Sequence, residues 1–174
     1  GIKERHVLLY ISRILPYKRL DILLDNFANI TDIALVIVGK GLTSEQAQIV
    51  NKTPNYYYLG EVYGEEVNNI YHMGDIFSTP GHIGLALNQA MFWGLPVVVL
   101  KGHHAPEITY LKDKYNGFLC NTVDNLRESI LELCSNENLL SQMSNNARIT
   151  YENEMSISQM FQGFMDAVQY VENR

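Results

Sequence analysis

Two basic residues, Arg13 and Lys18, lie in a short segment that joins an apolar run to a helical pattern. A guanidinium group forms forked hydrogen bonds with phosphate oxygens, and an ammonium group adds a compact positive charge. Placed together at the end of a strand, these two side chains would bind a diphosphate. Basic side chains are mostly solvated on protein surfaces, so a pair of ordinary surface cations is the alternative interpretation.

A second segment, Thr79–Leu85, carries Gly81 and Gly84 where another strand pattern passes into a helical one. Glycine lets the backbone approach a ligand closely, and the start of a helix offers free N–H groups to a phosphate. His82 could hydrogen-bond a sugar or phosphate oxygen. The alternative is a tight turn in which the glycines serve only geometry and His82 caps the loop.

Glu107 follows the pair His103-His104 in a third segment. Adjacent histidines point apart in most backbones and no third ligand is near in sequence, so we expect no metal site there. Glu107 is a candidate substrate-binding residue, although a carboxylate at the start of a helical turn also pairs with the helix dipole.

These segments belong to a regular alternation of strand and helix patterns. Short apolar runs typical of strands are His6–Ile11, Ile33–Val38, Tyr56–Leu59, Ile76–Thr79, Val97–Leu100 and Gly117–Cys120. Helical patterns cover Lys18–Ile30, a segment capped by Thr43, Glu65–His72, Leu85–Trp93, a turn from Pro106 and three C-terminal helices, one of them capped by Ser156.

This alternation predicts parallel strands joined by right-handed crossovers. We therefore predict an α/β fold, a doubly wound parallel sheet of about six strands with helices on both faces. Ligands of such sheets bind outside the carboxyl ends of the strands, near the switch in strand order. All three chemistry-bearing segments follow predicted strands.

Length and charge narrow the class of protein. The 174 residues suit a single domain, 1–174, and the net charge of -6 argues against nucleic-acid binding. Cys120 and Cys134 are interpreted as reduced core thiols of a cytoplasmic protein. No stretch is long and apolar enough for a membrane span. The start at Gly-Ile-Lys, directly before a strand, suggests a piece of a longer protein.

The order and spacing of seven motifs across residues 7–120 resemble the C-terminal domain of the retaining GT-B glycosyltransferases. The motifs are Ser12–Asp21, Leu35–Gly41, Tyr58–Glu61, Gly74–Pro80, Gly84–Met91, Gly94–Val98, and Pro106–Ile108 followed by Asn116-Gly117. Each motif is weak, whereas their shared order is specific. The resemblance implies a Rossmann-like half of a GT-B fold that binds a nucleoside-diphosphate sugar as donor substrate, with no cofactor and no metal.

The resemblance also assigns roles to residues. Arg13 and Lys18 would neutralise the charge that builds on the leaving diphosphate, which is their catalytic role. Backbone amides at Gly84 and Leu85 would hold the distal phosphate. The turn that begins at Gly60 and Glu61 would lie along the nucleobase.

The sequence departs from the family pattern at two positions. The family carries two glutamates separated by seven residues, and here Gly81 and Gln89 stand in their places. Gln89 could accept a ribose hydrogen bond through its carbonyl, more weakly than a carboxylate would. Gly81 offers no side chain to the donor sugar, so His82 or Glu107 would have to hold it.

A GT-B enzyme builds its site between two domains, which implies an absent N-terminal acceptor domain as partner and an isolated domain without activity. The apolar stripe of the last helix would pack on that domain or on the chain's own sheet. Surface polysaccharide or glycan synthesis, with peripheral association at the inner face of the membrane, is expected from family resemblance only. A non-catalytic nucleotide- or partner-binding module and a GT-B-like sugar epimerase are the alternatives.

Overall fold

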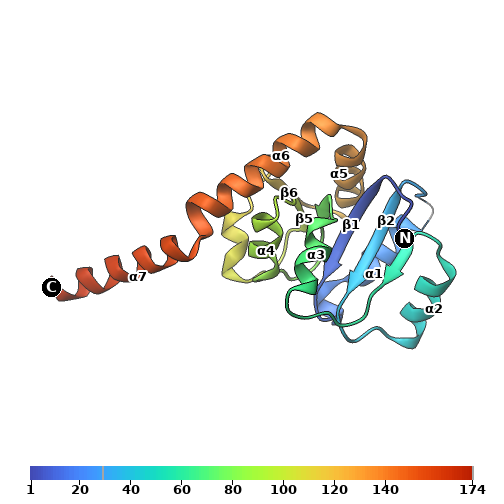
Figure 1. Cartoon of the computed structure of the whole chain (residues 1–174), viewed down its shortest axis with the longest axis horizontal. Coiled ribbons are helices and arrows are strands. Elements are labelled where there is room, and N and C mark those ends of the chain that lie inside the picture. The colour runs from blue at the N-terminus through green and yellow to red at the C-terminus, as the bar shows by residue number, and fades with distance from the viewer. Residues whose placement is uncertain (29, 174) are drawn as a thin grey trace.

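The computed structural model describes residues 1–28 and 30–173 of the chain (Figure 1). Within these residues six strands form one sheet: β1 (His6–Ile11), β2 (Ile33–Val38), β3 (Tyr56–Tyr58), β4 (Ile76–Phe77), β5 (Val97–Leu100) and β6 (Gly117–Cys120). The α-helices are α1 (Leu20–Phe27), α2 (Ser44–Lys52), α3 (Glu66–His72), α4 (Ala86–Phe92), α5 (Val123–Ser135), α6 (Glu137–Thr150) and α7 (Ile157–Glu172). Three short turns complete the chain: η1 (Pro16–Lys18), η2 (Pro106–Tyr110) and the π-helical η3 (Tyr151–Met155).

The strand order is β3-β2-β1-β4-β5-β6, and every neighbouring pair is parallel. This confirms the predicted doubly wound sheet. The chain first builds outward from β1 to β3 and then returns to the other side of β1 with β4. The switch in strand order therefore lies between β1 and β4, and the loops that follow these two strands become neighbours.

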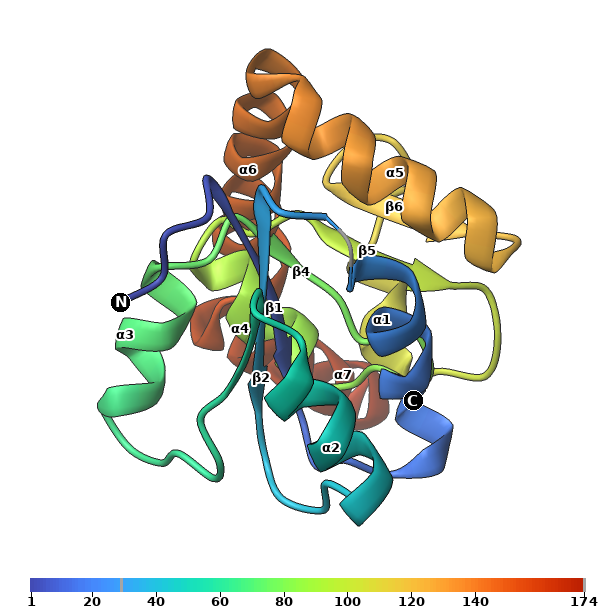
Figure 2. The same cartoon turned by 90° about the vertical axis from the view of Figure 1, so that its right-hand side faces the viewer.

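The core has two layers, one on each face of the sheet, as Figure 2 shows with α1 and α2 on one side and α3 and α4 on the other. Strand β2 is buried along its whole length, and its side chains alternate between the layers. Leu35 belongs to the core layer that contains residues of α1 and α5, and Val36 belongs to the layer that contains residues of α3 and α4. Burial on both faces explains why this strand reads as a continuous apolar run.

The first predicted helix is the main local difference. Instead of one helix from Lys18 to Ile30, the chain forms η1, breaks at Arg19 in the left-handed conformation (φ 58°), and begins α1 at Leu20. Helix α1 ends at Phe27, and position 29 lies outside the described residues. The break turns the chain so that the carbonyl groups of η1 face the loop after β4.

The predicted capping box at Thr43 is confirmed, and of the one predicted at Ser156 the described residues show the bond from the Gln159 N–H but no return bond. Thr43 and Gln46 exchange hydrogen bonds of 3.2 and 3.1 Å at the start of α2. The Ser156 side chain accepts from the Gln159 N–H at 3.3 Å and starts α7.

Helix α7 leaves the body of the domain (Figure 1), and none of its described residues is buried. Its apolar stripe is open to solvent, with Phe161 63% exposed and Phe164 67% exposed. The prediction that the chain's own sheet would cover this stripe is therefore wrong. The sheet is already covered by α3, α4 and η3 on the neighbouring face, which leaves α7 no place there.

Gly39 lies where two loops at the carboxyl edge of the sheet approach each other closely. Its φ is +138°, and an added Cβ would overlap the Ser12 carbonyl oxygen. We expect Gly39→Ala to lower the free energy of unfolding by at least about 2 kcal/mol in urea titrations, because both strain and a clash arise. The control is Gly102→Ala, where no atom lies within 4 Å of the new Cβ and a change below about 0.5 kcal/mol is expected. Equal effects of the two changes would refute this account.

Candidate functional site at the switch in strand order

The loops after β1 and β4 are joined through their backbones. The Gly81 N–H donates to the Lys18 carbonyl oxygen at 3.1 Å, and the His82 N–H donates to the Tyr17 carbonyl oxygen at 3.0 Å. These two bonds clamp η1 against the segment that follows β4. The predicted basic segment and the predicted glycine segment are thus brought together at the switch in strand order.

Gly81 is the point of closest approach in this clamp. A Cβ added there would overlap the Tyr17 carbonyl oxygen and would lie 2.9 Å from the Arg19 Cγ atom. The family's first glutamate cannot be accommodated here without moving the loop. Gly81 therefore contributes backbone contact and a border of the adjoining cavity, and it brings no side chain toward a donor sugar.

Lys18 faces the same place. Its ammonium group donates to the His82 carbonyl oxygen at 2.7 Å, and the residue is half-buried. Burial, and after it the positive charge of Arg13, lowers the pKa of the Lys18 ammonium from its ordinary value. Arg13 itself is exposed. The two predicted cations are therefore close enough to interact electrostatically, with Lys18 held by a hydrogen bond and Arg13 exposed to solvent.

Gly84 and Leu85 lie just before α4. Within the described part of the chain their N–H groups donate no hydrogen bond, whereas their carbonyl groups accept from Leu87 and Asn88 at 2.8 and 3.1 Å. Leu85 is 72% exposed, so its N–H group lies at the surface of the site. These amides have hydrogen-bonding capacity to spare, and their binding of a phosphate oxygen stays a prediction.

His104, considered at first only as a metal ligand, connects the loops after β4 and β5. Its Nδ1 atom accepts from the Ile83 N–H at 3.2 Å, and its Nε2 atom lies 2.8 Å from the Leu100 carbonyl oxygen. An acceptor at Nδ1 and a donor at Nε2 together require the neutral imidazole. Burial lowers the pKa of His104, and the charges of His82, His103 and Lys18 lower it further.

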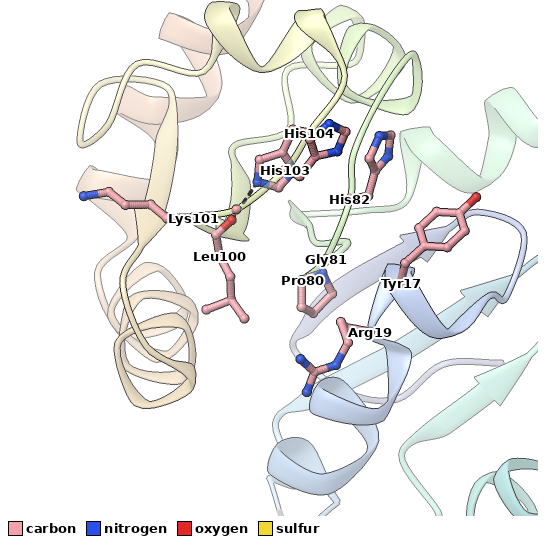
Figure 3. Close-up of a pocket in the computed structure, with 10 residues that line it drawn as sticks. Tyr17, Arg19, Pro80, Gly81, His82, Leu100, Lys101, His103 and His104 are labelled. Carbon is pink, nitrogen blue, oxygen red and sulfur yellow. Dashed lines mark hydrogen bonds between the residues drawn. The ribbon is translucent and has the colours of Figure 1, made fainter.

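A cavity of about 470 Å³ opens beside the clamp (Figure 3). Its lining residues are Tyr17, Arg19, Pro80, Gly81, His82, Leu100, Lys101, Gly102, His103 and His104. The ring of His82 contacts Tyr17 edge-on at 5.7 Å between centroids and lies 5.9 Å from the ring of His103. The buried Nδ1 atom of His82 has no hydrogen-bond partner among the described residues.

The histidines around the cavity are not arranged as a metal-binding cluster within the described residues. Across residues 1–28 and 30–173, no cluster of three or more His, Cys, Asp or Glu side chains has the arrangement needed to hold an ion. His103 is exposed at the cavity, whereas His104 forms hydrogen bonds that join two loops.

The remaining predicted residues lie around this centre. Gln89 is exposed on α4, and Glu107 is half-buried on η2 with an unpartnered buried Oε2 atom. The Gly60 turn follows β3, two strands from β1, and its carbonyl accepts from the Gly39 N–H at 2.7 Å. Glu61 is exposed on that turn. Among residues 1–28 and 30–173 no hydrogen bond or ion pair links these residues to Lys18, so we place them at the periphery of the candidate site.

Sequence reasoning missed Tyr17, Arg19 and Lys101 as parts of the site. Arg19 and Lys101 could have been proposed from the sequence, because each is a basic residue next to a strand end or turn on the carboxyl side of the sheet. Their place in one cavity depends on the strand order, which puts the β1, β4 and β5 loops side by side.

The fold and the site define a class of protein, a doubly wound parallel α/β domain with Arg13 and Lys18 in the loop at its switch in strand order. The family model described as Glycosyl transferases group 1 matches residues 1–150, and the chain belongs to this family. It is similar to the sulfoquinovosyl transferase SQD2 of Arabidopsis thaliana, with 27% identity over 128 residues, which cover 71% of this chain and 25% of that protein.

Solved structures share the fold. Anabaena HepE, in a complex with UDP and glucose, superposes with a TM-score of 0.83 at 19% identity, covering 98% of this chain and 50% of that one. The C-terminal domain of a glycosyl transferase group 1 protein (LpcC) from Francisella tularensis has a TM-score of 0.75 at 19% identity, covering 90% and 89%. The chain thus spans a quarter of its plant relative and half of HepE. None of the helices in the described residues has the length and apolar character to span a bilayer.

Removing the His104 imidazole should produce a pH-dependent loss of stability. The unfolded chain takes up a proton at His104 near the ordinary pKa of 6.5, whereas the folded chain does so only at lower pH. His104 therefore stabilises the fold above about pH 6.5, and this contribution falls as pH drops. We expect His104→Ala to cost about 1–2 kcal/mol at pH 8 and visibly less at pH 5.5 in urea titrations.

The control for this measurement is His72→Ala on the exposed surface of α3. We expect its cost to stay within about 0.5 kcal/mol. A cost of His104→Ala that grew on acidification would contradict the neutral hydrogen-bonded role.

Reinstating the family's carboxylate at position 81 should disrupt the clamp. Because a Cβ at this position overlaps the Tyr17 carbonyl oxygen, Gly81→Glu and Gly81→Ala should destabilise the chain by similar amounts, about 1–3 kcal/mol. Thermal unfolding of both variants checks this. A stable Gly81→Glu protein with higher donor affinity would show that the loop adapts readily to a glutamate.

Proposed function

We propose that the full-length protein transfers a sugar from a nucleoside-diphosphate sugar to an acceptor, and that this chain is its donor-binding half. The observation that carries the proposal is the convergence of Arg13, Lys18 and the free amides of Gly84 and Leu85 at the switch in strand order. Membership of the glycosyl transferases group 1 family supports it.

The chemistry at this end of the site is charge neutralisation. As the bond to the sugar breaks, negative charge accumulates on the leaving diphosphate, and cations already in place stabilise that charge without reorganisation. Lys18 meets this requirement because its ammonium group is held by the His82 carbonyl oxygen in a half-buried setting. Arg13 would close on the phosphates from the exposed side. With two cations supplied by the chain, we propose that transfer needs neither a metal ion nor a cofactor.

At the sugar end we assign the main polar contact to His82. Its unpartnered Nδ1 atom lies in a residue that directly follows Gly81 and whose carbonyl oxygen binds Lys18. Glu107 also has an unpartnered oxygen, on η2, and is the second candidate for a sugar hydroxyl. Gln89 would accept a single hydrogen bond from the ribose through its amide oxygen. The Gly60–Val62 turn, with Glu61, would border the nucleobase.

The acceptor side is proposed to lie on an N-terminal domain outside this chain. The chain spans half the length of HepE and a quarter of the length of the plant relative SQD2. This supports a two-domain protein. Helix α7 presents an exposed apolar stripe that projects from the domain, and we propose that this stripe packs on the partner domain. The chain by itself is then expected to bind donor without transferring sugar.

A cytoplasmic location is proposed on the basis of two free thiols, Cys120 and Cys134, which suit a reducing compartment. A role in surface polysaccharide or glycan synthesis and peripheral association with the inner face of the membrane stay predictions from family resemblance.

Two other functions are favoured by particular observations. A non-catalytic nucleotide- or partner-binding module would explain why Gly81 and Gln89 replace carboxylates. A sugar epimerase of the same fold would use the imidazoles around the cavity as acid and base. Turnover of a nucleotide sugar with a net transfer to acceptor by the full-length protein separates the proposed function from both.

The proposed diphosphate site is tested by Arg13→Ala combined with Lys18→Ala. Each lost charge-assisted hydrogen bond is worth about 1.5–3 kcal/mol, so calorimetric affinity for the bound nucleotide should fall at least roughly 100-fold in the double variant. UDP, GDP and their sugars are titrated into the chain to identify that nucleotide.

The matched control is Lys52→Ala, which removes an exposed cation at the end of α2. It should leave nucleotide affinity unchanged. If the double variant bound the nucleotide as tightly as the unmodified chain, the proposed site would be wrong.

A further inference from the structure

The cavity beside the clamp has an unusual charge pattern for a sugar-binding space. Among its ten lining residues are one arginine, one lysine and three histidines, and no carboxylate. Sugar hydroxyl groups are both donors and acceptors, so a site for a neutral sugar gains from acceptors such as carboxylates. Here no acidic side chain lines the cavity and Arg19 brings a guanidinium group to it, which suits a ligand that carries acceptors and negative charge.

Arg19 is the cation best placed for such a ligand. Its Nε and Nη2 atoms pair with the Asp21 carboxylate at 3.0 and 2.9 Å, which fixes the orientation of the guanidinium plane. The Nη1 group has no partner among the described residues and keeps its donors free. Figure 3 shows the guanidinium group below Pro80 and across the opening from Leu100.

The opposite side of the cavity is lined by imidazoles. His103 is exposed there, and the His82 ring lies between Tyr17 and His103 with its Nδ1 atom unpartnered. Lys101 stands on the β5 side, where Figure 3 shows its ammonium group turned outward. The ammonium group of Lys18 lies next to His82, because it donates a hydrogen bond to the His82 carbonyl oxygen. The cavity thus borders the proposed diphosphate site.

The volume matches a monosaccharide with a substituent. Binding sites for small ligands commonly have volumes of roughly 300–1,000 Å³, and this cavity measures about 470 Å³. No side chain from Gly81 occupies the border toward the diphosphate. A sugar joined to a diphosphate at Lys18 would therefore enter the cavity along that border.

We infer that the donor sugar carries an anionic group, such as the C6 carboxylate of a hexuronate, and that this cavity binds it through Arg19 and His103. The inference rests on the proposed function, since it places the sugar of the bound donor. A neutral sugar offers only hydroxyl acceptors to the free Nη1 group of Arg19 and to His103, whereas a carboxylate offers a charged acceptor and forms stronger hydrogen bonds.

The test compares donors that differ only at C6. UDP-glucose is titrated against UDP-glucuronate, and GDP-mannose against GDP-mannuronate, at 0.15 M NaCl with the 174-residue chain. With the nucleotide that the chain accepts, the hexuronate donor should bind at least roughly tenfold tighter than the neutral donor, as expected for one charge-assisted hydrogen-bonded pair. Equal or weaker binding of the hexuronate would overturn the inference while leaving the proposed function intact. Failure of every nucleotide and nucleotide sugar to bind would instead remove the proposed function itself.

Arg19→Asn isolates the cation. Asparagine tolerates the left-handed backbone of this position, where φ is 58°, so the turn can persist without the guanidinium group. The variant should lose most of the preference for the hexuronate donor and keep its affinity for the free nucleoside diphosphate. His103→Gln should reduce the preference in the same direction.

Lys114→Asn is the matched control. Lys114 is an exposed basic residue in the same backbone conformation, with φ 61°, and it lies between β5 and β6 away from the cavity. It should leave the preference unchanged. A preference that survived both Arg19→Asn and His103→Gln would show that the anionic group binds elsewhere.

Discussion

The whole site depends on one close approach of backbone to backbone at the switch in strand order. Gly81 donates to the carbonyl oxygen of Lys18, and His82 donates to that of Tyr17. The contact requires an absent side chain at position 81, because a Cβ would overlap the Tyr17 oxygen. It also requires the left-handed turn at Arg19, which separates η1 from α1 and directs the carbonyl groups of η1 toward the loop after β4. From this clamp follow the position of the Lys18 ammonium, the border of the cavity and the direction of Arg19.

The histidines show how one residue type takes different tasks in one place. His104 is neutral because it accepts from Ile83 and donates to Leu100, and it thereby ties the loop after β5 to the loop after β4. His103 remains exposed, and His82 keeps a buried nitrogen without a partner. A polar atom left in that state has a cost in the unliganded protein. Residues around a binding site can retain this cost because a ligand removes it, which is the physical basis for assigning His82 to the sugar.

Helix α7 and the cavity beside the clamp are both open to solvent. The cavity lies at an edge of the domain, and α7 carries large apolar side chains into solvent (Figure 1). A second domain that covered both would exclude water from the diphosphate and bury the stripe of α7. Water exclusion would strengthen the proposed interaction of Arg13 and Lys18 with a diphosphate, because charges attract more strongly in a medium of low dielectric constant. Activity is thus expected to depend on the rest of the protein, whereas donor affinity depends on this chain.

Four features could be predicted from the amino-acid sequence: the order of elements, the burial of β2 on both faces, the cap at Thr43 and the two segments that carry Arg13, Lys18, Gly81 and Gly84. These are local properties, because periodicity, caps and glycine positions are written in neighbouring residues. From the sequence, Gly81 was a position at which the family's glutamate is missing, and His103-His104 was a pair of histidines expected to bind no metal. Only the tertiary structure decided that Gly81 is a contact point, that His104 is a hydrogen-bonded tie, and that Arg19 shares a cavity with His103. Each of these facts joins residues from different loops at the carboxyl edge of the sheet, and strand order, not local pattern, brings these loops together.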